Sequence, residues 1–136
     1  MPKFSELSAA RLATCDERLQ RVFNKVVEHF DCTILEGHRS KEFQDLYFKL
    51  GKSKVKWPLG KHNSTPSRAV DAIPWPIDWN DTMRMTFFAG YVIGVASEMG
   101  IRLIWGHDWD GDTELHDQSF NDFPHFELKG ELKRVC

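Results

Sequence analysis

The chain has 136 residues, of which 41% are hydrophobic and 28% are charged, and its formal net charge is −2. This length suits one domain with a core of its own, so we expect a single domain over residues 1–136. The small negative charge excludes a global basic field that would attract nucleic acid or an anionic membrane.

A long helix is expected near the N-terminus. The segment Thr14–Glu17 (TCDE) has the form of a capping box, and apolar residues at helical spacing follow it. These features predict a helix over about residues 15–30, with a short helical lead-in from Ser5.

A strand and a second helix are expected next. Residues 32–36 (CTILE) have the composition of a strand. Ser40 is a suitable N-cap for a helix that runs to about Leu50, and Gly51 suits its C-terminal end. Residues 51–67 combine Gly, Ser, Pro and Lys without periodicity, which predicts a loop.

The second half of the chain is expected to contain three strands and one helix, and this helix has the clearest sequence pattern of those predicted. Residues 69–73 (AVDAI) are strand-like and are followed by two prolines. A helix is expected to begin at Asn80 or Asp81 and to end at Gly100. Two further strands and a polar loop complete the prediction: strands 101–105 and 125–128, and loop 106–122. This order predicts an α+β fold with helices packed on a small, mostly antiparallel sheet.

The cysteines and the N-terminal segment indicate a protein made in the cytoplasm. Cys15 and Cys32 lie in apolar patterns and are expected in the core; Cys136 makes the count odd, without zinc-knuckle spacing. A reducing compartment suits this usage. The first 20 residues are too polar for a signal peptide, and no apolar stretch reaches the roughly 18 residues that cross a bilayer.

Two charged stretches are interpreted as solvated loops. One is a basic tract, formed by Lys52, Lys54 and Lys56. The other is the acidic segment 108–117, whose carboxylates offer a second, regulatory ion site as the alternative. Those carboxylates are Asp108, Asp110, Asp112 and Glu114.

Four residues far apart in the sequence have the chemistry of a hydrolytic metal site. Zinc in a hydrolase takes three protein ligands and leaves a fourth position for water. His62 and Asp71 flank the start of a predicted strand, and His125 is a third donor near the C-terminus. Asp122, three residues before His125, is a carboxylate that can accept a proton from the attacking water.

Each candidate ligand also has an ordinary interpretation. His62 can be an exposed loop histidine, and His125 a satisfied core histidine. Asp71 is harder to explain in this way, because an unpaired carboxylate in an apolar strand is costly and needs a cation, N–H donors or a metal. Spacing alone leaves both interpretations open, and the helical HExxH motif is absent.

Five short motifs occur together and in order. They are EGHRS at 36–40, SK at 53–54, KHNSTPSRAVDAIPWP at 61–76, WGHDWDGD at 105–112 and DFPHFEL at 122–128. With these motifs the chain resembles the zinc D-Ala-D-Ala carboxypeptidase and L-alanyl-D-glutamate peptidase family, which shares its fold with the hedgehog signalling domain. Within that family it is most similar to the short phage endolysins.

The resemblance implies a role for each matching residue. His62, Asp71 and His125 are the implied ligands of one Zn²⁺ per chain, and Asp122 is the implied catalytic base. Arg39 is the implied arginine that holds substrate and stabilises the oxyanion, for which its forked, permanently charged donors are suited. The alternative for Arg39 is a surface arginine at a strand end.

Some positions depart from the family pattern or have less defined roles. The interval between the first histidine and the aspartate is longer than usual, a form that we associate with phage relatives. His107 stands where glycine is common, and is expected on a loop surface; His116 has no family role. Ser67, Asp108 and Trp109 are expected to shape the cleft, with core packing as the alternative for Trp109.

The implied function is hydrolysis of the peptidoglycan stem peptide, most simply at the L-Ala–D-Glu amide, for host cell lysis. We expect a monomeric catalytic domain without a wall-binding domain, released through a holin-type lesion, with no nucleic-acid partner and no membrane insertion. A D-Ala-D-Ala carboxypeptidase or dipeptidase is the alternative within the same chemistry. An inactive hedgehog-like binding domain is the other alternative, which the presence of Asp122 disfavours.

Overall fold

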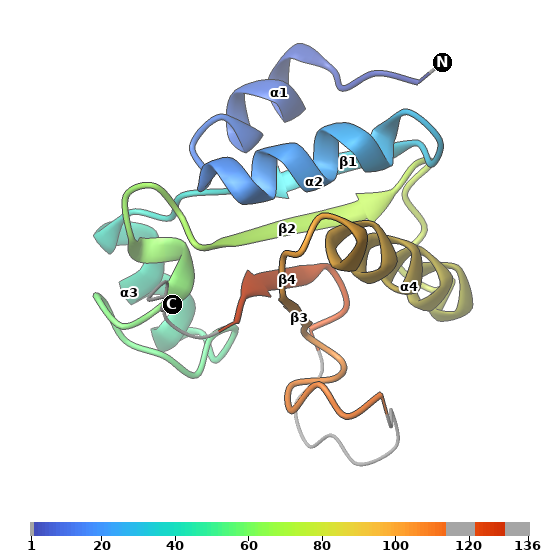
Figure 1. Ribbon diagram of the computed structural model, residues 1–136. Coiled ribbons are helices and arrows are strands. Elements are labelled where there is room, and N and C mark those ends of the chain that lie inside the picture. Colours follow the sequence, from blue (N-terminus) through green and yellow to red (C-terminus); the bar gives the residue numbers. More distant parts are fainter. Residues whose placement is uncertain (1, 114–121, 130–136) are drawn as a thin grey trace.

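The computed structural model describes residues 2–113 and 122–129 (Figure 1). These residues form four α-helices, a short 3-10 helix (η1) and four strands. In chain order the elements are α1 (Glu6–Leu12), α2 (Glu17–Val27), β1 (Cys32–Glu36), α3 (Lys41–Lys49), η1 (Lys61–Asn63), β2 (Ala69–Pro74), α4 (Thr82–Glu98), β3 (Leu103–Trp105) and β4 (His125–Leu128). None of the helices among the described residues has the length and apolar character needed to cross a membrane.

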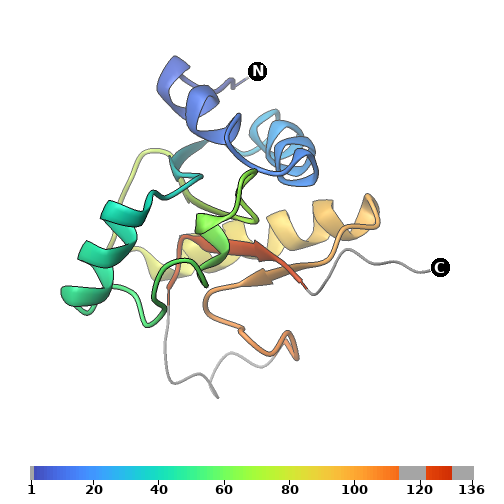
Figure 2. The same ribbon diagram turned by 90° about the vertical axis from the view of Figure 1, so that its left-hand side faces the viewer.

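The strands form one sheet in the order β1-β2-β4-β3, and every neighbouring pair is antiparallel. The last of the described strands, β4, therefore lies between β2 and β3, and Figure 2 shows β4 (red) beside β3 (orange). In the register of the sheet, Asp71 of β2 lies opposite Glu36 of β1 on one side and opposite His125 of β4 on the other. The α+β fold with an antiparallel sheet, predicted from the order of elements, is confirmed.

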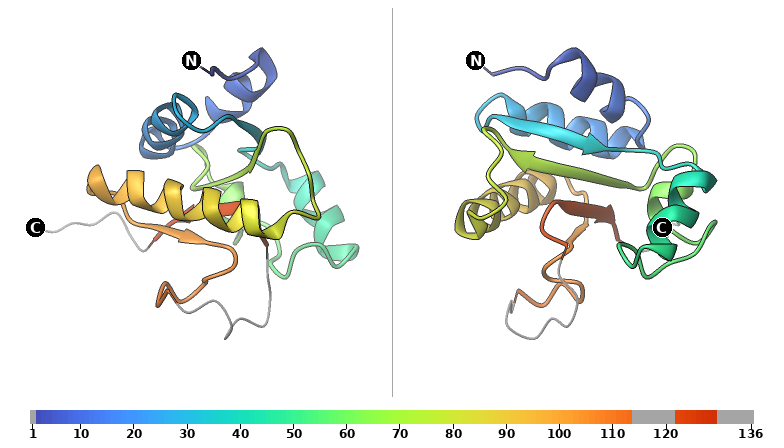
Figure 3. Two further views of the ribbon diagram at one scale, coloured as in Figure 1. Left: turned by 90° about the vertical axis from the view of Figure 1, so that its right-hand side faces the viewer. Right: turned by 180° about the vertical axis from the view of Figure 1, so that it is seen from behind.

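The hydrophobic core lies between one face of the sheet and the helices α2 and α4 (Figures 1 and 3). Phe126 of β4 is fully buried, and its ring lies 5.6 Å from that of Phe23 in α2 and 6.2 Å from that of Phe88 in α4. Because successive side chains of a strand point to opposite faces, burial of Phe126 on the helical face turns His125 to the other face. In the same way Val70, which is also in the core, places Asp71 on the face of His125.

The N-terminal helices differ from the prediction in their boundaries. The expected helical lead-in is confirmed as a separate helix, α1, and α2 is shorter than predicted. The proposed capping box at Thr14 is wrong, because Asp16 caps α2 by accepting from the amide of Arg18 at 2.9 Å. The Thr14 hydroxyl is used elsewhere: it donates to the Arg11 carbonyl at 2.7 Å and accepts from the His38 amide at 2.9 Å. It thus ties the end of α1 to the segment after β1.

Other boundaries agree closely with the sequence prediction. Ser40 caps α3 by accepting from the Phe43 amide at 3.2 Å, and Asp81 caps α4 by accepting from the Arg84 amide at 3.0 Å. Strand β2 extends through Pro74, one residue beyond its predicted end, and the loop predicted at 51–67 contains η1.

Cys15 and Cys32 lie in the core, as predicted, with 1% and 4% of their surface exposed. Burial raises the pKa of each thiol to about 12. Cys136, His116 and Glu114 lie outside the described residues, so the expectations for them stay predictions.

Candidate metal centre

Three donor side chains from three different elements converge on one point. Asp71 Oδ1 lies 3.2 Å from Nε2 of His62 and 3.2 Å from Nδ1 of His125. The candidate ligand atoms of these residues all lie within 4.8 Å of one another. Two imidazole nitrogens and a carboxylate oxygen form the donor set that zinc takes in hydrolases. The chemistry of the three residues therefore fits a zinc ion.

The fold explains how these residues meet. Asp71 and His125 are direct register partners on β2 and β4. His62 comes from η1, which is held against the segment after β1 by a hydrogen bond from the Arg39 amide to the His62 carbonyl at 2.8 Å. Its side chain is buried, with 3% of the residue exposed. The interpretation of His62 as an exposed loop residue is wrong, because η1 turns its ring inward under the polar loop.

The remaining nitrogen of each histidine ring has a hydrogen-bond partner. The Gly37 carbonyl accepts from His62 Nδ1 at 2.7 Å, and a Glu127 carboxylate oxygen lies 2.8 Å from His125 Nε2. Both partners are acceptors, so the hydrogens are placed on these nitrogens, and Nε2 of His62 and Nδ1 of His125 face Asp71. Hydrogen bonds of this kind orient metal-binding histidines and fix their tautomers.

The close packing behind His62 requires a glycine at position 37. A side chain at Gly37 would overlap the Thr14 hydroxyl and the Arg11 carbonyl. Without a side chain, the backbone of Gly37 can lie against the end of α1 and present its carbonyl to His62.

The three residues strongly perturb one another's ionisation. Burial opposes the charge on Asp71, but the positive charge of His62 and hydrogen bonds from both histidines hold its pKa well below the usual range. Burial likewise opposes the charge on His125, while its hydrogen bonds to Asp71 and Glu127 raise its pKa to about 10. The buried carboxylate that the sequence left unexplained thus has an imidazole partner on each of two sides.

Asp122 lies beside the three donors without joining them. Its carboxylate is 4.0 Å from His125 Nδ1, and 34% of its side chain is exposed. Burial and then the charge of Asp71 raise its pKa, which the positive charges of His125, His62 and Arg39 partly offset. A carboxylate placed next to a metal site but outside the ligand set can act as a general base.

The backbone of Asp122 is fixed by its neighbours. Its amide donates to the Gly106 carbonyl at 2.7 Å, and its carbonyl accepts from the His125 amide at 3.0 Å. A side chain at Gly106 would overlap the Asp122 carbonyl oxygen. The glycine of the WGHDW segment therefore permits the close approach that sets the position of Asp122.

Arg39 is held in place by three side chains. Its Nε and Nη2 donate to one carboxylate oxygen of Glu36, at 3.1 and 2.6 Å, and its Nη1 donates to Gln44 Oε1 at 3.1 Å. The guanidinium lies over the ring of Tyr47, 4.6 Å from its centroid. Nη2 is also 3.9 Å from Asp71 Oδ2. Only 10% of the side chain is exposed, so Arg39 is a fixed residue of the site and not a surface arginine.

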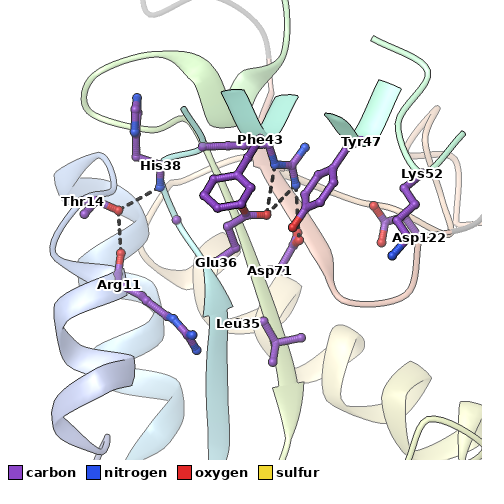
Figure 4. A pocket seen from close by; sticks show the side chains of 12 residues that line it. Arg11, Thr14, Leu35, Glu36, His38, Phe43, Tyr47, Lys52, Asp71 and Asp122 are labelled. Atoms are coloured by element: carbon purple, nitrogen blue, oxygen red, sulfur yellow. Dashed lines mark hydrogen bonds and ion pairs between the residues drawn. The ribbon is translucent and has the colours of Figure 1, made fainter. Parts of the chain in front are cut away.

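Two hollows meet at this site, and Arg39, Lys52 and Asp122 line both. The first has a volume of about 540 Å³ and is shown in Figure 4, where Tyr47, Asp71 and Asp122 lie around it. The second has a volume of about 460 Å³ and is bordered by the loop between α3 and η1. Its other lining residues include Lys54, Val55, Leu59, Trp109, His125 and Glu127. Because they share these three lining residues, the two hollows adjoin at Arg39 and Asp122.

The remaining sequence candidates occupy different places. Trp109 lines the second hollow, with its ring 5.3 Å from that of His125. Ser67 is fully buried beneath the site, where its hydroxyl donates to the Ala69 carbonyl at 2.6 Å. Asp108 borders a separate hollow and accepts from the Thr113 amide at 3.0 Å. Trp109 is therefore the one of these three whose side chain reaches the cleft.

His107 and the described acidic residues Asp108, Asp110 and Asp112 are not part of the three-donor group. The His107 ring stacks on Phe123 with 4.6 Å between centroids, which is a packing role. Asp108, Asp110 and Asp112 bring carboxylate oxygens within 4.8 Å of one another. The interpretation of this segment as a solvated acidic loop agrees with the exposure of Asp110 and Asp112.

Sequence reasoning missed two side chains of the site. Glu127 holds His125, and strand alternation could have identified it, since residues two apart share a face. Gln44 contacts Arg39 and is the buried residue of α3. The sequence signal that could have identified Gln44 is a polar residue on the inward face of a short predicted helix.

Comparison with known proteins gives three results. The chain matches the family of phage L-alanyl-D-glutamate peptidases over residues 1–129. It is 31% identical over 121 residues to the L-alanyl-D-glutamate peptidase of Escherichia phage T5, an alignment that covers 85% of this chain and 88% of that protein. Its fold is similar to that of the L-Ala D-Glu endopeptidase ChiX of Serratia marcescens, with a TM-score of 0.71, 24% identity and coverage of 94% of this chain and 91% of the other.

Proposed function

The chain belongs to the phage L-alanyl-D-glutamate peptidase family, and on this premise we propose that it is a zinc-dependent endolysin that cleaves the L-Ala–D-Glu amide of the peptidoglycan stem peptide. Membership of the family makes it a peptidase that acts on peptidoglycan. The metal, the bond and the role of each residue are the proposal.

One observation supports the metal and the chemistry most directly. His62, Asp71 and His125 form a donor set of zinc-binding type, and Asp122 lies 4.0 Å from His125 with its carboxylate partly exposed to the cleft. Zinc held by these three residues would supply a Lewis acid that polarises a carbonyl and acidifies a water molecule.

The remaining steps use side chains of the chain itself. Asp122 takes a proton from the attacking water and delivers it to the amine of D-Glu as the amide bond breaks. Arg39 donates to the oxygen of the scissile carbonyl as negative charge develops on it. Counted over the described residues, Arg39 uses three of its five N–H groups on Glu36 and Gln44, which leaves one on each terminal nitrogen for this oxygen.

Digestion of purified murein sacculi would test the bond. We expect mass spectrometry of the soluble products to show peptides with a new N-terminal D-Glu. Loss of terminal D-Ala alone would contradict the proposal and would indicate a carboxypeptidase. If the protein binds the metal but releases no product, the result would favour an inactive binding domain.

We also propose host cell lysis as the biological role, since the relative from phage T5 is a bacteriophage protein. Wild-type protein added to outer-membrane-permeabilised cells is expected to lower their turbidity. The Asp122→Asn protein, which keeps the three donors, is the matched control and is expected to leave turbidity unchanged. Equal clearing by both proteins would contradict the catalytic basis of this role.

A further inference from the structure

Gln44 is a buried amide whose two ends bind different parts of the cleft. It is 1% exposed and is the buried residue of α3. Its oxygen accepts from Arg39 Nη1 and from Asn63 Nδ2, each at 3.1 Å. Its nitrogen donates to Ser53 Oγ at 3.0 Å and to the Val55 carbonyl at 2.7 Å. All four hydrogen bonds of the amide group are therefore satisfied.

The oxygen of Gln44 holds the catalytic side of the cleft. Arg39 donates to this oxygen from Nη1, while its Nε and Nη2 donate to Glu36. Two different acceptors thus fix the plane of the guanidinium. Asn63, the other donor to Gln44, directly follows the candidate ligand His62 in η1 and also donates to the Arg39 carbonyl at 3.3 Å.

The nitrogen of Gln44 holds the wall of the second hollow. That wall is formed by the loop between α3 and η1, which includes Lys52, Ser53, Lys54 and Val55. The loop has no regular secondary structure at residues 53–56, so side-chain contacts must define its position. The Gln44 amide makes two such contacts within three residues, to Ser53 and to Val55.

We propose that Gln44 is a positioning residue that couples the orientation of Arg39 to the placement of the loop that contacts substrate. This inference rests on the proposed function, because Arg39 is taken as the donor to the oxyanion. Gln44 borders the second hollow but is only 1% exposed, and its four hydrogen bonds all go to protein groups, so its amide acts through Arg39 and the loop. Its oxygen sets the geometry of the reacting centre and therefore kcat, whereas its nitrogen sets the wall of the second hollow and therefore KM.

A purely structural role for Gln44 makes a different prediction. If the amide only satisfied buried polar groups, its loss would lower thermal stability and leave kcat and KM of the folded protein unchanged. If Gln44 is a positioning residue, loss of the bonds from its nitrogen should raise KM, and loss of the bonds to its oxygen should lower kcat. Two substitutions at the same site distinguish these interpretations.

The experiment compares Gln44→Glu with Gln44→Met in steady-state cleavage of a soluble stem peptide. A glutamate keeps acceptor oxygens for Arg39 and Asn63 but cannot donate to the Val55 carbonyl. We expect Gln44→Glu to raise KM by about tenfold, as for a lost hydrogen bond, with kcat within about threefold of wild type. Gln44→Met loses both ends and is expected to lower kcat by about 10²-fold as well, in line with the cost of misplaced catalytic groups.

Two further measurements accompany the kinetics. Zinc content is expected to stay at the wild-type level in both variants, because Gln44 touches none of the three donors. Hydrogen exchange of the amides at 52–56 is expected to become faster in both. The matched control is Gln20→Met, since Gln20 donates one bond to the Cys15 carbonyl at 2.9 Å in α2, away from the cleft; its kcat and KM are expected to equal those of wild type.

A folded, zinc-loaded Gln44→Met protein with wild-type kcat would overturn the inference. Equal loss of kcat in Gln44→Glu and Gln44→Met would overturn it too. If Gln44→Met does not fold, the glutamate variant decides alone, through raised KM with retained kcat. These outcomes compare variants with an active wild type, whereas wild-type protein that releases no N-terminal D-Glu would contradict the proposed function itself.

Discussion

Asp71 and His125 lie directly opposite each other on β2 and β4, with 3.2 Å between Asp71 Oδ1 and His125 Nδ1. The register of an antiparallel pair therefore fixes two of the three donors of the candidate metal site. A shift of either strand by one residue would turn the donor of that strand to the opposite face of the sheet and separate it from its partner. The same pairing that buries Phe126 against α2 and α4 thus presents the two donors to the cleft.

Substitution of Asp71 tests the metal site. We expect Asp71→Asn to lower zinc affinity by at least about 10²-fold, because the anionic oxygen that faces both histidines is lost. Zinc stoichiometry after dialysis measures this, with circular dichroism to verify folding. Asp45→Asn is the control, since among the described residues Asp45 pairs with Lys41 alone, on the exposed side of α3. Wild-type zinc content in Asp71→Asn would contradict the assignment.

Zinc binding is expected to release protons. His125 has a pKa raised to about 10, so at pH 7 it carries a proton that a metal ion must displace. As pH rises towards that pKa, less of the histidine is protonated, and apparent zinc affinity is expected to increase. Calorimetry at pH 7 in buffers of different ionisation enthalpy should show about one proton released per zinc from this group. Affinity independent of pH between 6 and 9 would argue against His125 as a ligand.

Asp122 is expected to be essential for turnover and dispensable for metal binding. Asp122→Asn should lower kcat by about 10²–10⁴-fold, the range for loss of a general base, while zinc content stays that of wild type. Stem-peptide cleavage and metal analysis of one preparation give both values. Near-normal cleavage by the zinc-loaded variant would remove Asp122 from the mechanism.

Gly106 offers a test of the position of Asp122 without changing its chemistry. A methyl group at residue 106 overlaps the Asp122 carbonyl, so Gly106→Ala is expected to displace the base and lower kcat by about tenfold or more. Gly94→Ala is the matched control, because beyond its own turns of α4 no described residue lies within 4 Å of the added methyl group. That control is expected to keep full activity and to gain about 0.5–1 kcal/mol in unfolding free energy. Reversal of these effects would contradict the packing described for Gly106.

Cys15 and Cys32 are expected to resist alkylation in the native protein. Burial raises both pKa values to about 12, so at pH 8 neither thiol is accessible or ionised. Iodoacetamide labelling followed by peptide mass spectrometry should modify these two residues only after denaturant is added. Rapid native labelling of either would show that the turn between α1 and α2, which contains Cys15, or β1, which contains Cys32, opens readily.

Most of the fold could be predicted from the sequence, because the local patterns agree with the tertiary structure. Apolar spacing and the caps at Ser40 and Asp81 gave α3 to within one residue and α4 to within two. The capping box at Thr14 failed because its hydroxyl serves a contact with His38, a residue 24 positions away that no local pattern reveals.

In the candidate site, too, some features could be predicted from sequence motifs and others depend on the tertiary structure. His62, Asp71, His125, Asp122 and Arg39 were predicted from motifs, and the structure brings them together. The burial of His62 was not predictable, because a loop without periodicity gives no sign that a 3-10 turn directs one of its rings inward. Ser67 was expected at the cleft but lies under it, since its hydroxyl completes backbone hydrogen bonds.

The position of β4 between β2 and β3 has a consequence for when the protein can become active. Before residues 125–128 enter the sheet, β2 and β3 have no shared partner, and Asp71 lacks the imidazole that faces it. Insertion of this single strand joins the two parts of the sheet, delivers His125, and places Asp122 beside it. Assembly of the scaffold and assembly of the reactive centre are thus one event, and a chain in which residues 125–128 have not yet paired with β2 and β3 holds an incomplete donor set.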